Sequence, residues 1–176
     1  MSKKRIVLGG GCFWCIEAVF SNVKGVVSAI SAYTGGKRPN PSYQSVCTGV
    51  SGHAEVVDIT YDSEKIQLQD ILEIFFVIHD PTTLNRQGAD TGTQYRSVIY
   101  YDNTEEQEEI EKFILKMQAK FSDPIVTELS QLGQVYPAEE YHQNYYRLHS
   151  QQGYCQVVIE PKLRKFMQEF PEHLAD

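Results

Sequence analysis

The sequence of 176 residues contains no long apolar run, and this absence bears on where the protein works. Its longest apolar stretch is Ile74 to Ile78, well short of the roughly 18 residues that a membrane span needs. Only Ile6, Val7 and Leu8 separate the basic residues near the start from a run of glycines, whereas a secretory signal peptide carries an apolar segment of roughly 7–15 residues. We therefore expect a cytoplasmic protein without a membrane partner.

Positive charge is scarce as well. Lys and Arg number 16 against 23 Asp and Glu, which gives a net charge of −7. A negative surface repels phosphate backbones, so nucleic acid is not an expected partner. The length and a hydrophobic fraction of 41% are typical of one globular domain, which we expect to span residues 1–176.

Cysteine occurs at only four positions, namely Cys12, Cys15, Cys47 and Cys155. A domain of this size folds without disulfides, so we expect these thiols to be reduced and available for chemistry. Cys12 and Cys15 have the spacing of half a zinc site, but the second close pair of ligands is missing. We therefore expect no bound metal.

Local patterns predict strands and helices in an irregular succession. Because the two kinds of element do not alternate strictly, we expect an α+β fold with one mixed sheet flanked by helices. Residues 150–155 lack apolar periodicity and are predicted to form a loop. The predicted strands are residues 5–8, 26–33, 54–62, 95–101 and 125–129, and the predicted helices are residues 12–20, 68–79, 104–121, a segment after Pro137 and 161–170.

The most informative segment is the glycine run that ends at Cys12. A strand, a glycine turn and a cysteine that opens a helix make a plausible nucleophile site, because exposed N–H groups at a helix start favour a thiolate. An ordinary buried cysteine is the alternative, but it would not explain the glycines. Phe13 and Trp14 lie about 100° apart on a helix, so both cannot point into one core. We expect them to wall a small apolar pocket beside Cys12.

Glu55 is the second signal, because alternation places it on the apolar face of a strand with Val57, Ile59 and Tyr61. Burial raises the pKa of a carboxyl group, so Glu55 would stay protonated near neutral pH and act as a proton donor. A structural glutamate paired with Arg96 is equally compatible with this pattern.

Five separated motifs in order resemble the peptide methionine sulfoxide reductases of the A type, over nearly the whole chain from Gly9 to Cys155. The motifs are Gly11-Cys12-Phe13-Trp14, Pro39-Asn40-Pro41-Ser42-Tyr43 followed by Gly52-His53-Ala54-Glu55, His79-Asp80-Pro81-Thr82, Gly92-Thr93-Gln94-Tyr95-Arg96-Ser97 and Gln151-Gln152-Gly153-Tyr154-Cys155.

The resemblance implies a role for each matching residue. Cys12 would attack the sulfoxide sulfur, and Glu55 would protonate the sulfoxide oxygen directly or through water. The Tyr43 and Tyr95 hydroxyls would assist by hydrogen bonding, and Asp90 would hold a polar water or hydroxyl network. Phe13 and Trp14 would embrace the S-methyl group of the substrate.

The resemblance also implies how the enzyme is recycled. Reduction of methionine (S)-sulfoxide, free or in oxidised proteins, would leave a sulfenic acid on Cys12. A second cysteine would condense with it to a disulfide, which thioredoxin would reduce, so no cofactor is expected. The implied fold is a mixed sheet flanked by helices with an irregular C-terminal tail.

The resolving cysteine is left open between Cys155 and Cys15. Many members of the family carry glycine where this chain has Cys15. We favour Cys155, because residues 150–160 are expected to form a mobile tail that reaches Cys12 with less strain than a short-loop disulfide to Cys15. Cys47 is expected to be a structural passenger.

A thiol–disulfide oxidoreductase that uses Cys12 and Cys15 is the alternative function. Simple thiol exchange, however, gives Glu55 and the tyrosines no task.

Overall fold

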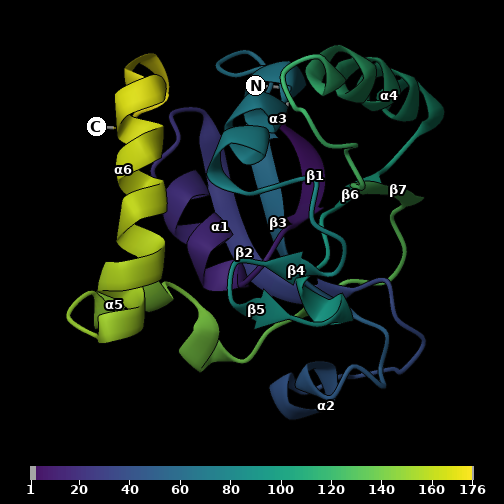
Figure 1. Ribbon diagram of the computed structural model, residues 1–176, viewed down its shortest axis with the longest axis vertical. Coiled ribbons are helices and arrows are strands. Elements are labelled where there is room, and N and C mark those ends of the chain that lie inside the picture. The colour runs from purple at the N-terminus through teal and green to yellow at the C-terminus, as the bar shows by residue number, and fades with distance from the viewer. Residues whose placement is uncertain (1–2, 176) are drawn as a thin grey trace.

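A six-stranded mixed sheet forms the centre of the fold in the computed structural model, which describes residues 3–175 (Figure 1). The strand order is β7-β6-β1-β3-β2-β8; β6 and β7 are parallel, and the other neighbours are antiparallel. The bounds are β1 Lys3–Gly9, β2 Val26–Thr34, β3 Ala54–Asp62, β6 Val98–Tyr101, β7 Glu128–Gln131 and β8 Tyr136–Pro137. The expected α+β class and mixed sheet are confirmed.

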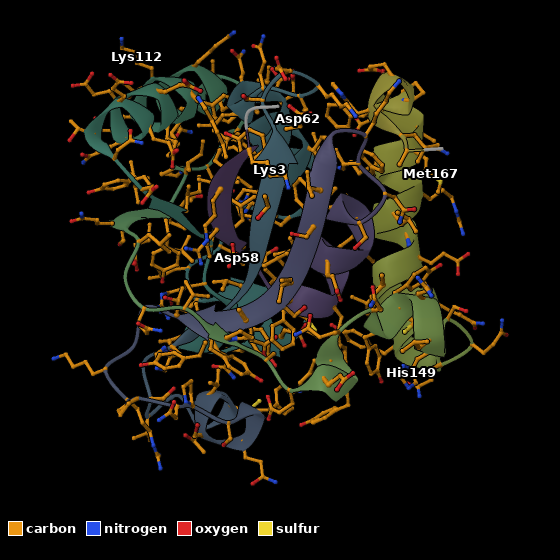
Figure 2. The ribbon with its side chains drawn as sticks, turned by 180° about the vertical axis from the view of Figure 1, so that it is seen from behind. Lys3, Asp58, Asp62, Lys112, His149 and Met167 are labelled. Atoms are coloured by element: carbon orange, nitrogen blue, oxygen red, sulfur yellow. The ribbon has the colours of Figure 1, made fainter. Side chains whose placement is uncertain are left out.

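The helices lie mainly on one face of this sheet. Figure 1 shows α1 and α6 side by side, and in Figure 2, seen from behind, β2 and β3 lie in front of α1. The helices are α1 Phe13–Phe20, α2 Tyr43–Cys47, α3 Leu68–Ile78, α4 Thr104–Gln118, α5 Tyr145–His149 and α6 Glu160–Glu169. The 3₁₀ turns are Thr93–Tyr95, Glu140–His142 and Pro171–His173, a π-helical turn is Cys155–Ile159, and β4 (Arg86–Gln87) pairs with β5 (Asp90–Thr91) in a separate hairpin.

Strand β3 contributes side chains to both apolar clusters of the protein, because its residues alternate between the two faces of the sheet. Val57, Ile59 and Tyr61 are buried in the main hydrophobic core, together with α1 and α3. Val56, on the opposite face, belongs to a smaller apolar cluster. Burying one such side chain stabilises the fold by roughly 1.5–3 kcal/mol. The same alternation takes Glu55 into the main core, since it shares the face of Val57.

Two predictions about the C-terminal part are wrong. The helix expected directly after Pro137 begins only at Tyr145, because Asn144 adopts a left-handed conformation (φ 55°) that interrupts it. The loop expected around Cys155 gives way to helix from residue 153 onward, whereas the mobility expected of residues 150–160 stays a prediction. Cys155 and Ile159 are fully buried, one helical turn apart, whereas the preceding glutamines face solvent.

The ends of the expected single domain, residues 1, 2 and 176, lie outside the described residues. No helix within residues 3–175 is both long and apolar enough to cross a membrane.

Candidate active site

The turn between β1 and α1 requires glycine because other side chains pack closely against its backbone. A Cβ atom on Gly10 would lie 2.7 Å from the ring of His79, and one on Gly11 would lie 3.0 Å from Gln87. Gly11 also has φ +85°, a conformation that side chains rarely adopt. The turn that leads to Cys12 therefore sits directly on the end of α3 and on the β4–β5 hairpin.

His79, which belongs to one of the five motifs, packs against Gly10 in this turn. Its Nδ1 contacts the carbonyl oxygen of Phe75, and a carbonyl only accepts, so Nδ1 carries the proton. Nε2 then accepts from the Ser97 hydroxyl at 2.7 Å. Burial lowers the pKa of His79 to about 3, so the imidazole stays neutral.

Cys12 is the N-cap of α1, as predicted, and is 7% exposed. Its sulfur accepts a hydrogen bond from the Trp14 backbone N–H and lies within hydrogen-bonding distance of the Tyr154 hydroxyl, and both neighbours favour the thiolate. Burial nevertheless raises the pKa of the thiol well above its ordinary range, and the nearby Glu55 and Cys15 raise it further. The hydrogen bond from the first turn of α1 favours the thiolate, but desolvation outweighs its effect on the pKa of Cys12.

Glu55 is fully buried in β3. Its Oε1 accepts the Phe13 backbone N–H at 3.2 Å, and its Oε2 has no hydrogen-bond partner among residues 3–175. Burial raises the pKa of Glu55 to about 8, against the effect of the Phe13 N–H and with a further rise from Asp90. Glu55 is consequently protonated at neutral pH. The alternative pairing with Arg96 is wrong, because that guanidinium contacts Glu128 at 3.4 Å.

Two tyrosines from separate loops lie near Glu55. Tyr43 is the first residue of α2, and its ring lies 6.5 Å from that of Phe13. Tyr95 ends a 3₁₀ turn, and its carbonyl oxygen accepts the Gly11 N–H at 3.1 Å. Burial first, and the charge of Glu55 next, raise the pKa values of both phenols, so both remain hydrogen-bond donors.

Cys47 was expected to be a structural passenger, but its exposed thiol is hydrogen-bonded to the Tyr43 hydroxyl. Burial raises the pKa of Cys47, and the Tyr43 hydroxyl opposes the rise.

Tyr154 was missed as a site residue, although it stands beside Cys155 in the last motif. Its hydroxyl donates to the Asp90 carboxylate at 3.1 Å and lies within hydrogen-bonding distance of the thiols of Cys12 and Cys15. Asp90, in β5, thus accepts a hydrogen bond from a residue next to Cys155. The C-terminal part of the chain thus reaches both thiols through one phenol.

Phe13 and Trp14 diverge, as their helical spacing predicts. Phe13 is fully buried, 5.6 Å from the ring of Tyr33 and 5.1 Å from that of His142. Trp14 is half-buried; its indole stacks on Tyr145 with 3.7 Å between ring centroids, and its N–H donates to His142 Nδ1 at 3.0 Å. His142 and Tyr145 were also missed, because aromatic residues at helical spacing are ordinarily core.

The remaining thiols are both buried. Cys15 is 1% exposed in the first turn of α1, where its N–H donates to the Cys12 carbonyl oxygen at 3.1 Å. Such a turn keeps the two Cα atoms within roughly 7 Å, which is compatible with a disulfide. Cys155 has no exposed surface and lies in the π-helical turn Cys155–Ile159 rather than in a loop. In the described part of the chain, no cluster of three or more His, Cys, Asp or Glu is arranged to hold a metal ion.

Comparisons with known proteins agree with this geometry. The family model for peptide methionine sulfoxide reductase matches residues 4–174. A peptide methionine sulfoxide reductase MsrA from Polynucleobacter asymbioticus is 52% identical over 174 residues, which cover 98% of this chain and 92% of that protein. The reduced form of Mxr1 from Saccharomyces cerevisiae matches with a TM-score of 0.81 and 35% identity, covering 87% of this chain and 89% of that one. Mxr1 in complex with Trx2 matches with a TM-score of 0.58 and 26% identity, covering 81% and 84%.

Proposed function

The chain belongs to the peptide methionine sulfoxide reductase family, and we propose that it works through Cys12 as nucleophile and Glu55 as proton donor. The enzyme reduces methionine sulfoxide to methionine, and a thioredoxin restores its reduced form. One observation carries the assignment of residues. The nearly buried thiol of Cys12 lies within electrostatic range of Glu55, a protonated carboxyl group whose Oε2 has no partner among the described residues.

In the first step the sulfur of Cys12 attacks the sulfoxide sulfur, and Glu55 gives its proton to the sulfoxide oxygen. The oxygen passes to Cys12 as a sulfenic acid, and the thiol proton replaces the one that Glu55 lost. The substrate sulfur gains two electrons and Cys12 loses two. A carboxyl group with a pKa of about 8 suits this task, because general acids work best when their pKa lies near the operating pH.

The tyrosines and aromatic rings orient the substrate in this proposal. The hydroxyls of Tyr43 and Tyr95 donate to the sulfoxide oxygen, which accumulates negative charge as the sulfur–oxygen bond breaks. Trp14, which is half-buried, contacts the S-methyl group. Phe13 has no exposed surface, so its contact with the methyl group requires a displacement of the side chains that cover its ring. Asp90 holds the Tyr154 hydroxyl that faces both thiols.

Cys15 resolves the sulfenic acid in our proposal, and Cys155 is the alternative. Attack by the Cys15 sulfur on the Cys12 sulfur forms a disulfide and releases water. The turn at the start of α1 supports Cys15, since its hydrogen bond keeps the two residues close. Cys155 requires the π-helical turn Cys155–Ile159 to open before it reaches Cys12.

The test is one turnover without reductant, followed by mass spectrometry of the protein. The S epimer of methionine sulfoxide, the expected substrate, should yield one equivalent of methionine and a Cys12–Cys15 disulfide. Cys15→Ser should still release methionine but accumulate a sulfenic acid that dimedone traps, whereas Cys155→Ser should cycle with thioredoxin. The opposite pair of results would assign resolution to Cys155, and partial slowing in both would indicate a relay.

The alternative function, a thiol–disulfide oxidoreductase, receives no support from Glu55, since disulfide exchange needs no buried acid. Reduction of a protein disulfide by the wild type that is lost in Cys12→Ser, with no sulfoxide reduction by the wild type, would favour it. A cytoplasmic location and a single domain over residues 1–176 stay predictions.

A further inference from the structure

Glu17 is a buried carboxylate that the proposed reaction does not use. It lies in α1 and is 3% exposed. Both of its oxygens accept the backbone N–H of Asn144, at 3.0 and 2.9 Å, and the N–H of Tyr145 adds a further hydrogen bond. No ion pair to Glu17 is present in residues 3–175. Burying a carboxylate without a cation costs free energy, so we asked what these hydrogen bonds stabilise.

The N–H groups that Glu17 accepts are those at the start of α5. Asn144, the N-cap of α5, makes no side-chain capping bond and has φ 55°. Helix α5 contains only five residues, far fewer than an isolated helix needs for stability. Glu17 therefore caps α5 from another helix, by satisfying donors that the helix itself leaves unpaired. Figure 1 shows α5 beside the start of α6, below α1.

This cap holds both partners of Trp14. Glu17 and Trp14 are three residues apart on α1 and so lie on the same side of the helix. Tyr145, directly after Asn144, stacks on the indole with the two rings 6° from parallel, and His142 accepts the indole N–H at 3.0 Å. The orientation of the indole thus depends on the segment that Glu17 fixes.

We propose that Glu17 is a positioning residue for the methionine side-chain pocket, because its carboxylate fixes the segment that orients the Trp14 indole. The proposal rests on the proposed role of Trp14 as the wall that meets the S-methyl group. Glu17 acts on substrate binding through Trp14 and leaves Cys12 and Glu55 in place. Its loss should therefore raise KM and leave the maximal rate of methionine release nearly unchanged.

The test uses Glu17→Ala and Glu17→Gln in the full chain, with Glu108→Ala on the exposed face of α4 as control. Trp14 is the only tryptophan, so its emission reports the indole directly. Glu17→Ala should raise KM for N-acetyl-methionine sulfoxide by about 10-fold or more, with the single-turnover rate at saturation within about threefold and a red-shifted emission. Glu17→Gln keeps an acceptor oxygen and should restore both readouts. The control should match the wild type.

A double-mutant cycle with Trp14→Phe separates positioning from a general structural effect. The KM effect of Glu17→Ala should largely vanish in the Trp14→Phe background. Unchanged KM and emission in Glu17→Ala, or a KM effect that persists undiminished without Trp14, would overturn the proposal. Should Glu17→Ala not fold, Glu17→Asp takes its place with the same readouts, because it keeps the charge but withdraws the carboxylate by one methylene. If Trp14→Phe alone leaves KM unchanged, the proposed pocket fails, while the emission shift still reports whether Glu17 orients the indole.

Discussion

Replacing Glu55 by glutamine removes the carboxyl proton and keeps nearly everything else. The amide oxygen still accepts the Phe13 N–H, and the volume of the buried side chain hardly changes. A positioned general acid accelerates a reaction by roughly 10²–10⁴-fold, which corresponds to about 3–5 kcal/mol of barrier. We therefore expect Glu55→Gln to lower kcat/KM for sulfoxide reduction by that factor near pH 7.

The pH dependence gives the sharper result. In the proposed reaction the reactive form has Glu55 protonated and Cys12 ionised, while the pKa of Glu55 is about 8 and that of Cys12 is raised well above its ordinary range. Below pH 8 the thiolate fraction grows tenfold per pH unit, and kcat/KM rises with it. Above pH 8 the loss of the Glu55 proton cancels this gain, so the wild-type profile levels off and then falls beyond the pKa of Cys12. Glu55→Gln has no acid to lose, so its profile continues to rise past pH 8.

The assay is stopped-flow single turnover between pH 6 and 10, with kcat/KM taken from the dependence on substrate concentration. The ratio of wild type to Glu55→Gln should be constant below pH 8 and shrink about tenfold per unit above it. A wild-type profile that climbs without a break through pH 9, or a variant within a few-fold of wild type at every pH, would refute the assignment of Glu55 as the acid.

Three further predictions concern neighbouring residues. Cys12→Ser should fold normally but release no methionine in a single-turnover assay, because a hydroxyl ionises far less readily than a thiol. In urea unfolding, the wild type should lose stability relative to Glu55→Gln as the pH rises from 4.5 to 8, because the folded state keeps a proton on Glu55 that the unfolded state releases. The rise in the pKa of Glu55 from 4.5 to about 8 corresponds to a loss of about 5 kcal/mol in the free energy of unfolding over that window. Gly10→Ala should cost about 1–3 kcal/mol by overpacking against His79, whereas Gly133→Ala, with open space around the new Cβ, should be nearly neutral.

The features that the sequence predicted correctly are those written in local periodicity. The alternation of residues 54–62 matches the bounds of β3, and it took Glu55 to the core face. Glycines followed by a cysteine indicated a strand, a turn and a helix start, and Cys12 is the N-cap of α1. These patterns are short-range, so neighbouring residues suffice to interpret them.

The features that sequence reasoning missed depend on contacts between distant segments. Tyr154, His142 and Tyr145 reach the site from the last third of the chain, and no spacing between them and Cys12 signals this. Cys155 looked mobile because polar residues precede it, yet its own side chain faces the core together with Ile159. Burial by a remote segment cannot be inferred from flanking polarity alone.

The burial of Cys12, which the sequence did not reveal, changes the mechanism because it raises the pKa of the thiol. A helix start attracts a thiolate in water, but here desolvation keeps the thiol protonated at rest. The sulfoxide itself must then help to activate the site. In the proposed mechanism its oxygen supplies the partner that Glu55 Oε2 lacks among the described residues, and its electropositive sulfur faces Cys12. The thiolate is therefore stabilised chiefly when the substrate is bound, so the binding energy is used in the transition state and the resting thiol is a poor target for other oxidants.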